Sequence, residues 1–337
     1  MLKADTAEAP GPANAAERLA TIAYDDMRRV DALILERLDS HVELIPELAR
    51  YLIEAGGKRV RPMITVAAAN MIGHTDMAPV RLAAAVEFIH TATLLHDDVV
   101  DESGMRRGKA AANLVWGNAS SVLVGDFLFA RSFSLMVEAG SMKALGVLSA
   151  AASTIAEGEV RQLSAVKDIG VTVDTYMQII DAKTAALFAA AAQVSGIVAG
   201  RPDAEEAALE TYGRELGLAF QLVDDALDYG GAAAQLGKST GDDFREGKVT
   251  LPVALCLQKA EGEEAEFWRR VIAEGDQSDG DFERALALMD GHGALAATVE
   301  QAREHAARAR RALSVFPDNT WRHALEDLAD FVVERAY

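Results

Sequence analysis

Cysteine, proline and aromatic residues are scarce in this sequence, and each shortage narrows the possible structures. The 337 residues include one cysteine, Cys256, so no disulfide can form within the chain. This cysteine lies in the apolar run LPVALCL and is predicted to be a small buried side chain. Eight prolines, 6% aromatic residues and 50% hydrophobic residues, with alanine frequent, favour closely packed helices over a β-rich fold.

Basic residues are also in deficit, with 33 lysines and arginines against 52 aspartates and glutamates and a net charge of −19. Such a surface disfavours nucleic acid and anionic membranes as non-specific partners. No window approaches the ~18 uninterrupted apolar residues of a membrane span, so no stable membrane insertion is expected. The N-terminus lacks the apolar core of a secretory signal. Together with the single cysteine, these absences predict a cytoplasmic protein.

The chain is predicted to form one helical domain behind a short tail. Residues 1–16 are rich in alanine, proline, glycine and acid, and are predicted to be a disordered tail. From there, helical periodicity continues to the C-terminus, and no convincing alternating strand is found. Helix breaks are predicted at 56–57, 73–76, 101–108, 168–172, 200–203, 229–247, 275–280 and 291–293. None of these breaks resembles a linker, so residues 17–337 are predicted to be a single all-α bundle of long helices.

Among the features that the sequence does contain, two acidic clusters are the most informative. Asp97, Asp98 and Asp101 form a DDxxD motif after an apolar helical stretch, and the spacing recurs at 224–228 in FQLVDDALDY. Residues four apart share one face of a helix, so the first and last aspartates of each motif point the same way. A lone motif would also suit a solvated helix end, but two copies after apolar helices favour binding of hard divalent cations such as Mg²⁺. Cations held by carboxylates imply a polyanionic ligand, for which diphosphate is the natural candidate.

Basic side chains follow both acidic clusters. Arg106 and Arg107 come just after the first, and Lys238 and Lys248 flank a glycine-rich segment after the second. A loop of this kind can close over a phosphate site and exclude water. These residues are therefore predicted to bind a leaving diphosphate.

Further candidates lie in other helices. The run GGKRVRP at 56–62 could hold a second anionic substrate. Lys183 lies in a mostly apolar helix, where a lysine is costly to bury unless it is paired. Gln221, three residues before Asp224, shares a helix face with the second acidic cluster, and His90 shares a stripe with the first. A structural amide remains the alternative for Gln221.

These residues occur in five ordered motifs that resemble those of the trans-isoprenyl diphosphate synthases, and most closely the long-chain polyprenyl diphosphate synthases of ubiquinone biosynthesis. The resemblance covers the chain from about residue 20 to its end. The motifs are GGKRVRP at 56–62, LLHDDVVDESGMRRG at 94–108, KTAALF at 183–188, FQLVDDALD at 220–228 and GKSTGDDFREGKVTLP at 237–252. The resemblance implies the isoprenoid synthase fold, in which long antiparallel helices surround a deep central cavity, and a homodimer.

The resemblance also implies a role for each motif residue. Two Mg²⁺ ions would be held by Asp97, Asp98 and Asp101, and a third by Asp224 with Asp225 and Asp228 nearby, with Mn²⁺ as a possible substitute. The allylic diphosphate would be bound by Arg106, Lys183, Thr184, Gln221, Lys238 and Lys248. Isopentenyl diphosphate would be bound by Lys58, Arg61, His90 and Arg107. The catalytic set would be Asp97, Asp98, Asp101, Arg106, Lys183 and Asp224.

The implied reaction adds isopentenyl diphosphate repeatedly to an allylic diphosphate such as farnesyl diphosphate. The product would be a long all-trans polyprenyl diphosphate, decaprenyl or octaprenyl to solanesyl, for the ubiquinone side chain. A geranylgeranyl diphosphate synthase is the nearest alternative. A class I terpene cyclase needs no second diphosphate site, so GGKRVRP and Arg107 argue against it. A non-catalytic helical subunit should show decay in at least one motif, and none is visible.

Product length should depend on the residues below the first acidic motif. Thr93 and Ala92 lie four and five residues before Asp97, about 6–7 Å deeper along the helix. Farnesyl-making relatives place bulky aromatic residues there, whereas both are small here, so the cavity floor is expected further down. Phe129 and Phe133, with Phe127, are candidates for that floor, although plain core packing would also explain each of them.

Overall fold

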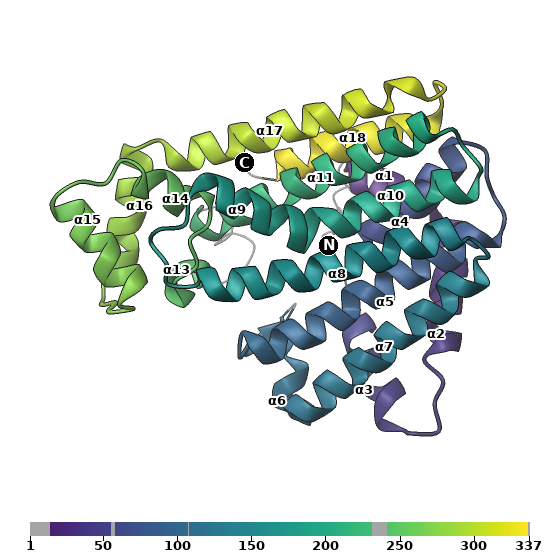
Figure 1. Cartoon of the computed structure of the whole chain (residues 1–337), viewed down its shortest axis with the longest axis horizontal. Helices are drawn as coiled ribbons and strands as arrows, with labels where there is room; N and C mark the ends of the chain where they lie inside the picture. The colour runs from purple at the N-terminus through teal and green to yellow at the C-terminus, as the bar shows by residue number, and fades with distance from the viewer. Residues whose placement is uncertain (1–13, 55–57, 107, 231–240, 336–337) are drawn as a thin grey trace, which may run out of the picture.

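The computed structural model describes residues 14–54, 58–106, 108–230 and 241–335, which are almost entirely helical (Figure 1). The elements are α1 (Ala15–Ile22), α2 (Tyr24–Arg37), α3 (Leu44–Glu54), α4 (Val60–Met71), α5 (Met77–Val100), β1 (Met105–Arg106), β2 (Lys109–Ala110), α6 (Ala112–Trp116), α7 (Asn118–Glu138), α8 (Met142–Ala165), α9 (Val173–Ile180), the π-helical turn η1 (Asp181–Ala185), α10 (Ala186–Val198), α11 (Asp203–Tyr229), α13 (Asp242–Glu246), α14 (Leu251–Leu257), α15 (Glu263–Trp268), the π-helical turn η2 (Arg269–Ala273), α16 (Asp281–Gly291), α17 (Ala294–Ala312), the 3₁₀ turn η3 (Leu313–Val315) and α18 (Thr320–Glu334).

The long helices form the body of the molecule. Figure 1 shows α17, α11, α10, α8, α5 and α7 running across it, with the short helices α13 to α16 gathered at one end. The predicted all-α bundle is confirmed. Predicted helix breaks at 73–76 and 200–203 are confirmed too, because α4 and α10 end at Met71 and Val198, and the next helices begin at Met77 and Asp203. The break at 56–57 lies outside the described residues.

Two details differ from the sequence prediction. The first helix begins at Ala15, inside the predicted 1–16 tail, where Asn14 and Glu17 form a reciprocal capping box. Residues 1–13 of that tail lie outside the described residues. The structure also contains one short antiparallel pair, in which Met105 faces Ala110 and Arg106 faces Lys109. Strands of two residues are too short to show alternation, so no sequence pattern could have announced them.

The hydrophobic core has two parts that meet along α10. One part centres on α11 and the C-terminal helices, and the other on α5 and α7. By length and composition alone, α5 and α7 could each cross a membrane. In the fold, however, 72% of the apolar window of α5 is buried, against 39% for α7. We therefore interpret α5 as a core helix and α7 as a helix with an exposed apolar side.

Helices α10 and α11 approach each other unusually closely. A Cβ added at Gly213 would lie 2.2 Å from the carbonyl oxygen of Phe188. At Gly217, an added Cβ would lie 2.7 Å from the Cα of Ala185 in η1. Only glycine permits these contacts, which place η1 directly against the helix that carries the second acidic motif.

Candidate active site

The first acidic motif ends α5. Asp97 and Asp98 lie in its last turn, and Asp101 is its C-terminal cap. Carboxylates at this end of a helix add to the negative end of the helix dipole, so they require positive partners. Asp98 is fully buried and accepts hydrogen bonds from Arg106, with the Arg106 Nε at 2.8 Å. Asn113 also holds this turn by donating to the main-chain oxygen of Asp98 at 3.0 Å.

Asp97 lines a cavity of about 670 Å³. Burial raises the pKa of its carboxyl to about 7, with Glu159 and Asp101 adding to the rise and Lys183 opposing it. Asp101 lies 3.5 Å from the Nζ of Lys248. The carboxylates at the end of α5 therefore lie close to lysine side chains that offset their negative charge.

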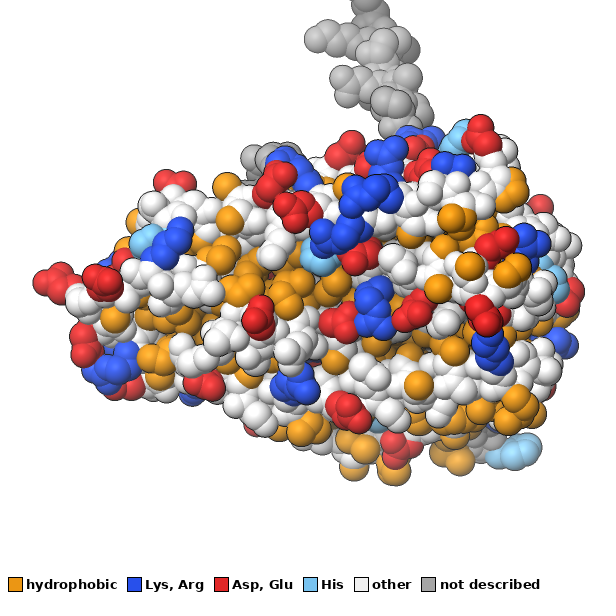
Figure 2. Space-filling view, turned by 45° about the horizontal axis from the view of Figure 1, so that its top comes forward, with side chains coloured by type: hydrophobic (Ala, Val, Ile, Leu, Met, Phe, Trp, Pro, Cys, Tyr) orange, Lys and Arg blue, Asp and Glu red, His pale blue; other side chains and the backbone are white. Residues whose placement is uncertain are grey.

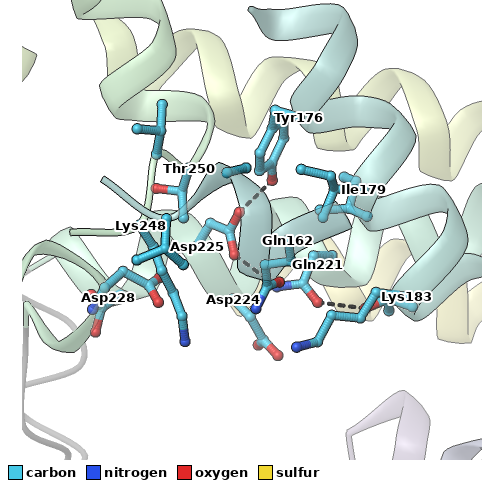
Figure 3. Close-up of a pocket in the computed structure, with 16 residues that line it drawn as sticks. Gln162, Tyr176, Ile179, Lys183, Gln221, Asp224, Asp225, Asp228, Lys248 and Thr250 are labelled. Carbon is cyan, nitrogen blue, oxygen red and sulfur yellow. Dashed lines mark hydrogen bonds between the residues drawn. The ribbon is translucent and has the colours of Figure 1, made fainter. Parts of the chain in front are cut away.

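The second acidic motif lies near the C-terminal end of α11 (Figure 3). Asp224 forms an ion pair with Arg335, in which the Asp224 Oδ1 lies 2.9 Å from the Arg335 Nη2. Asp228 accepts hydrogen bonds from the main-chain N–H groups of Asp242 and Asp243, at 3.2 and 3.0 Å. Burial raises the pKa of Asp228, and these N–H donors oppose the rise. Asp228 thus fastens the segment beyond 231–240 to α11.

Asp225 of the same motif is buried and has partners for both of its oxygens. Tyr176 donates its hydroxyl to Oδ2, and Gln221 donates its amide to Oδ1 at 2.7 Å. Burial raises the pKa of the Asp225 carboxyl, and these two donors oppose that rise. Asp225 therefore faces protein donors, whereas Asp224 is more exposed.

The two acidic motifs face common space. A second cavity, of about 290 Å³, shares Lys183, Thr184, Gln221 and Asp224 with the larger one. Both Asp97 and Asp224 line the larger cavity. Its size is typical of a small-molecule site. The structure thus brings together side chains that are more than a hundred residues apart in the sequence.

Basic residues complete the lining of these cavities. The Lys183 Nζ pairs with Glu159 at 2.8 Å, so this half-buried lysine has an acidic partner, although not one from the two acidic motifs. Arg61 lies 3.2 Å from the His90 Nε2 and stacks over Phe188 with its Cζ 4.3 Å from the ring centroid. Lys58 lies over the ring of Phe331 and also lines the larger cavity. Arg107 and Lys238, which were predicted to bind diphosphates, lie outside the described residues.

The predicted chain-length residues occupy different surroundings. Thr93 lines the larger cavity, and its hydroxyl donates to the His90 carbonyl at 2.8 Å. Ala92 is buried in the α5–α7 core. Phe129 and Phe133 form an edge-to-face pair, with ring centroids 5.3 Å apart, that packs on this core together with Phe127. The residues that line the two cavities do not include these three phenylalanines.

Sequence reasoning missed Glu159, Tyr176 and Arg335. Each lies in a helix, or at a helix end, without any recognised motif, and each reaches the site only through packing. Their partners Lys183, Asp225 and Asp224 are 24, 49 and 111 residues away. Glu159, for example, is a single half-buried acid in α8, and nothing in the sequence around it indicates that it pairs with Lys183.

The acidic side chains fit a divalent cation in their chemistry. In the part of the chain that the structure describes, no three His, Cys, Asp or Glu side chains converge closely enough to bind one ion as they stand. However, Asp98 Oδ2 is buried without a hydrogen-bond partner. Carboxylate oxygens from both motifs also border the same space, and hard cations such as Mg²⁺ prefer oxygen donors. The donor chemistry of these residues therefore fits a hard divalent cation.

Comparison with known proteins agrees with this geometry. The family model for polyprenyl synthetase matches residues 42–289. The chain is 51% identical to the octaprenyl diphosphate synthase of Escherichia coli over 319 residues, which cover 95% of this chain and 98% of that protein. The crystal structure of a decaprenyl diphosphate synthase from Rhodobacter capsulatus superposes with a TM-score of 0.93 at 55% identity, covering 96% of this chain and 99% of that one.

A third relative was solved with ligands. The polyprenyl synthase from Caulobacter crescentus, complexed with calcium and isoprenyl diphosphate, superposes with a TM-score of 0.92 at 55% identity. This comparison covers 97% of the present chain and all of the other. The chain therefore belongs to the polyprenyl synthetase family and is a prenyltransferase of isoprenoid biosynthesis.

Proposed function

We propose that this chain condenses isopentenyl diphosphate repeatedly onto an allylic diphosphate to make a long-chain all-trans polyprenyl diphosphate. The observation that carries this proposal is the single cavity on which Asp97, Asp224 and Lys183 converge from three helices. The aspartates of this cavity can hold metal cations, and its lysine and arginine side chains can bind diphosphate groups. Such a cavity suits two diphosphate substrates. The octaprenyl and decaprenyl synthases among the relatives support the long product.

The protein's part in the reaction is to position the substrates and to stabilise charge. Lys183, Thr184 and Gln221, with Arg106, Lys238 and Lys248, would hold the allylic diphosphate. Lys58, Arg61, His90 and Arg107 would hold isopentenyl diphosphate. Leu94, Phe188 and Phe220 add apolar wall to the cavity and would limit water near the reacting carbons.

The acids would hold Mg²⁺, about three ions by family resemblance, with Mn²⁺ as a substitute. Asp97, Asp98 and Asp101 would provide oxygens on one side of the cavity, and Asp224, flanked by Asp225 and Asp228, on the other. Bound there, the cations would neutralise the diphosphate as it leaves. The calcium bound by the Caulobacter relative supports a divalent site in this family.

The condensation needs no side-chain base, because the departing diphosphate can accept the proton that is released. The bond between the allylic carbon and the diphosphate oxygen breaks, and the electron pair leaves with the diphosphate, stabilised by Lys183 and Arg106. The double bond of isopentenyl diphosphate attacks the allylic carbon and forms the new carbon–carbon bond. A proton then passes from the added unit to the departed diphosphate. Holding both substrates in register supplies much of the rate enhancement.

We further propose that the product is decaprenyl diphosphate or an octaprenyl to solanesyl homologue, for the ubiquinone side chain. Thr93 borders the larger cavity, the small Ala92 lies behind it in the core, and Phe129 and Phe133 would lie toward the floor. The change Ala92→Phe should shorten the product while leaving the first condensations intact, because the ring would block the growing chain. Product mass spectrometry checks this, and an unchanged product length would mean that the chain grows along another path.

The protein is proposed to be a cytoplasmic homodimer without stable membrane insertion. The α7 face, which we define by the exposed side chains Val122, Leu123 and Val137, offers apolar surface for a second copy. Burying such a face against an identical one is the usual arrangement of symmetric dimers. The homodimer that the family resemblance implies supports the same state.

The central experiment is to incubate the protein with farnesyl diphosphate, isopentenyl diphosphate and Mg²⁺, and to determine the product mass. A ladder that ends between octaprenyl and decaprenyl supports the proposal. A ladder that stops at geranylgeranyl keeps the reaction but refutes the role of the small residues Ala92 and Thr93. A cyclic hydrocarbon would indicate a terpene cyclase. Mg²⁺-dependent bisphosphonate binding without turnover would indicate an inactive subunit, and the absence of binding a scaffold.

A further inference from the structure

A buried chain of hydrogen bonds links α9 to the proposed diphosphate site (Figure 3). It begins at Tyr176, which is 3% exposed and lies in no recognised motif. Tyr176 donates its hydroxyl to Asp225, and Gln221 donates to the other oxygen of Asp225 at 2.7 Å. Thr184 then donates to the Gln221 Oε1 at 2.8 Å. The chain thus joins α9, α11 and η1 through four side chains.

Because Asp225 is a carboxylate, it fixes which group donates and which accepts in each of these hydrogen bonds. An ionised carboxylate only accepts hydrogen bonds, so Gln221 must turn its NH₂ group toward Asp225. Its carbonyl oxygen then faces Thr184 and accepts the Thr184 proton. The Tyr176 hydroxyl supplies the remaining donor that buried Asp225 needs. Removing this hydroxyl would leave one carboxylate oxygen without that donor and would loosen the orientation of the Gln221 amide.

The backbone of η1 is held from two sides at the same place. A Cβ added at Gly158 of α8 would lie 2.9 Å from the Lys183 nitrogen. On the other side, Gly217 of α11 packs against Ala185. A π-helical turn inserts an extra residue into the helix, and such turns occur often at functional sites. With the backbone confined by glycines, the hydrogen bond to Gln221 sets how the Thr184 hydroxyl meets the cavity.

We propose that Tyr176 is a positioning residue that acts through Asp225 and Gln221 to orient Thr184 for the allylic diphosphate. This inference rests on the proposed function of the site. In this role, Asp225 holds Tyr176 and Gln221 at the wall of the smaller cavity, whereas Asp224 lines both cavities. Tyr176 lines the smaller cavity but not the larger one, where the substrates would meet.

The first test compares Tyr176→Phe with Tyr212→Phe. Tyr212 is the matched control, because it is also fully buried and donates its hydroxyl to the Leu325 carbonyl at 2.8 Å, outside both cavities. Tyr176→Phe should raise the KM for farnesyl diphosphate about tenfold, the cost of one misaligned hydrogen-bonded group. The KM for isopentenyl diphosphate should change less than about twofold, and Tyr212→Phe should leave both constants near wild type.

A binding readout separates this inference from the proposed reaction. Calorimetric titration with inorganic diphosphate and Mg²⁺ should give about tenfold weaker binding for Tyr176→Phe than for Tyr212→Phe. If the wild-type protein binds diphosphate but makes no polyprenyl product, the proposed function fails while the inference survives. If the wild-type protein is active and both variants bind diphosphate equally well, the inference is overturned.

A double-mutant cycle tests whether the effect travels along the hydrogen-bond chain. Thr184→Val removes its far end. In that background, Tyr176→Phe should weaken diphosphate binding by less than about threefold, because the group it positions is already gone. Independent, multiplicative losses would refute the relay.

A second variant serves if Tyr176→Phe does not fold. Asp225→Asn replaces one of the two acceptor oxygens with an NH₂ donor, so Tyr176 and Gln221 no longer each have an oxygen of their own, and the variant should reproduce the loss of diphosphate affinity. Mn²⁺ binding, followed by electron paramagnetic resonance, should weaken less in Asp225→Asn than in Asp224→Asn. Equal weakening in the two variants would show that Asp225 binds the cation directly, against the inference.

Discussion

At the scale of single residues, the structure satisfies the charges of the site with its own side chains. Each acidic motif is paired with at least one cation from elsewhere in the chain. The pairs are Asp98 with Arg106, Asp101 with Lys248, and Asp224 with Arg335. If a divalent cation binds these aspartates and a diphosphate binds their lysine and arginine partners, the two ligands together replace the ion pairs within the protein. Binding of the two should therefore be positively coupled, with the same factor in both directions.

Arg335 offers the clearest test of this exchange. Arg335→Gln removes the cation that competes for Asp224, so Mn²⁺ should bind roughly threefold more tightly in the absence of diphosphate. Paramagnetic resonance titration measures the affinity. Arg310→Gln is the control, because it breaks the exposed 3.0 Å pair between Arg310 and Asp330, which lies outside both cavities. Unchanged or weaker Mn²⁺ binding in Arg335→Gln would contradict the exchange.

At the scale of elements, close helix contacts decide where the site residues stand. The approach of α10 to α11 requires the absence of a side chain at Gly213. This contact brings η1 against the helix that carries Asp224. Glycine is otherwise a poor residue inside a helix, so its position here indicates packing rather than local preference.

Gly213→Ala should therefore destabilise the protein by about 2 kcal/mol or more, because its methyl group would overlap the Phe188 carbonyl. Gly146→Ala is the matched control in α8, since a Cβ there meets nothing within 4 Å. That change should stabilise by about 0.5–1 kcal/mol through helix propensity. Chemical denaturation measures both, and similar free energies of unfolding would refute the role of the close contact.

A second element contact joins η2 to the start of α16. Arg270 donates to both oxygens of Asp281, at 2.7 and 2.9 Å. The main chain and hydroxyl of Ser278 each donate to Asp281 at 2.8 Å. These donors, Arg270 first, hold the pKa of Asp281 below its ordinary value. A lowered pKa stabilises the fold above the unfolded-state pKa, near 3.9, and this stability is lost as the pH falls below it.

Asp281→Asn should consequently cost about 1–3 kcal/mol of unfolding free energy at pH 7. The difference from wild type should shrink once the pH falls below about 4, where the Asp281 carboxylate of the unfolded wild-type chain begins to be protonated while that of the folded protein stays ionised. Urea denaturation at several pH values measures the gap. Asp203→Asn is the control, since the Asp203 side chain is 97% exposed and its change should cost little. A gap that stays constant down to the lowest pH would contradict this linkage.

At the scale of the whole molecule, the surface combines excess acid with an apolar helix face. On the face shown in Figure 2, acidic and basic side chains are interspersed, with hydrophobic side chains between them. The net charge of −19 should keep the protein soluble without steering it to polyanions. On α7, the large apolar side chains of Leu123 and Val137 are 67% and 65% exposed.

If the α7 face pairs with a second copy, Leu123→Glu should convert the dimer to a monomer at micromolar concentration. Two copies of the new carboxylate would face each other across a symmetric contact, at a cost of several kcal/mol. Sedimentation velocity distinguishes the 35.9 kDa chain from its dimer. Val315→Glu, on η3, is the control for adding charge at an exposed apolar site. A dimeric Leu123→Glu protein would place the interface elsewhere, and a monomeric wild type would exclude it.

The sequence by itself determined the helices, their breaks and the local order of the motifs. Asp97 and Asp101 share a face because helix geometry relates residues four apart, whatever the rest of the chain does. Five motifs in order were likewise enough to indicate the family and the divalent chemistry. Glycine-rich breaks were visible because glycine favours turns over helix interiors.

Only the tertiary structure decided which side chains meet. It buried Asp98 beneath Arg106, tied Asp225 to Tyr176 across 49 residues, and brought Arg335 to Asp224 across 111. These contacts depend on how closely and at what angle the helices pack, which no periodicity encodes. Helix geometry is local and repeats along the chain, whereas a cavity exists only where distant helices have packed together.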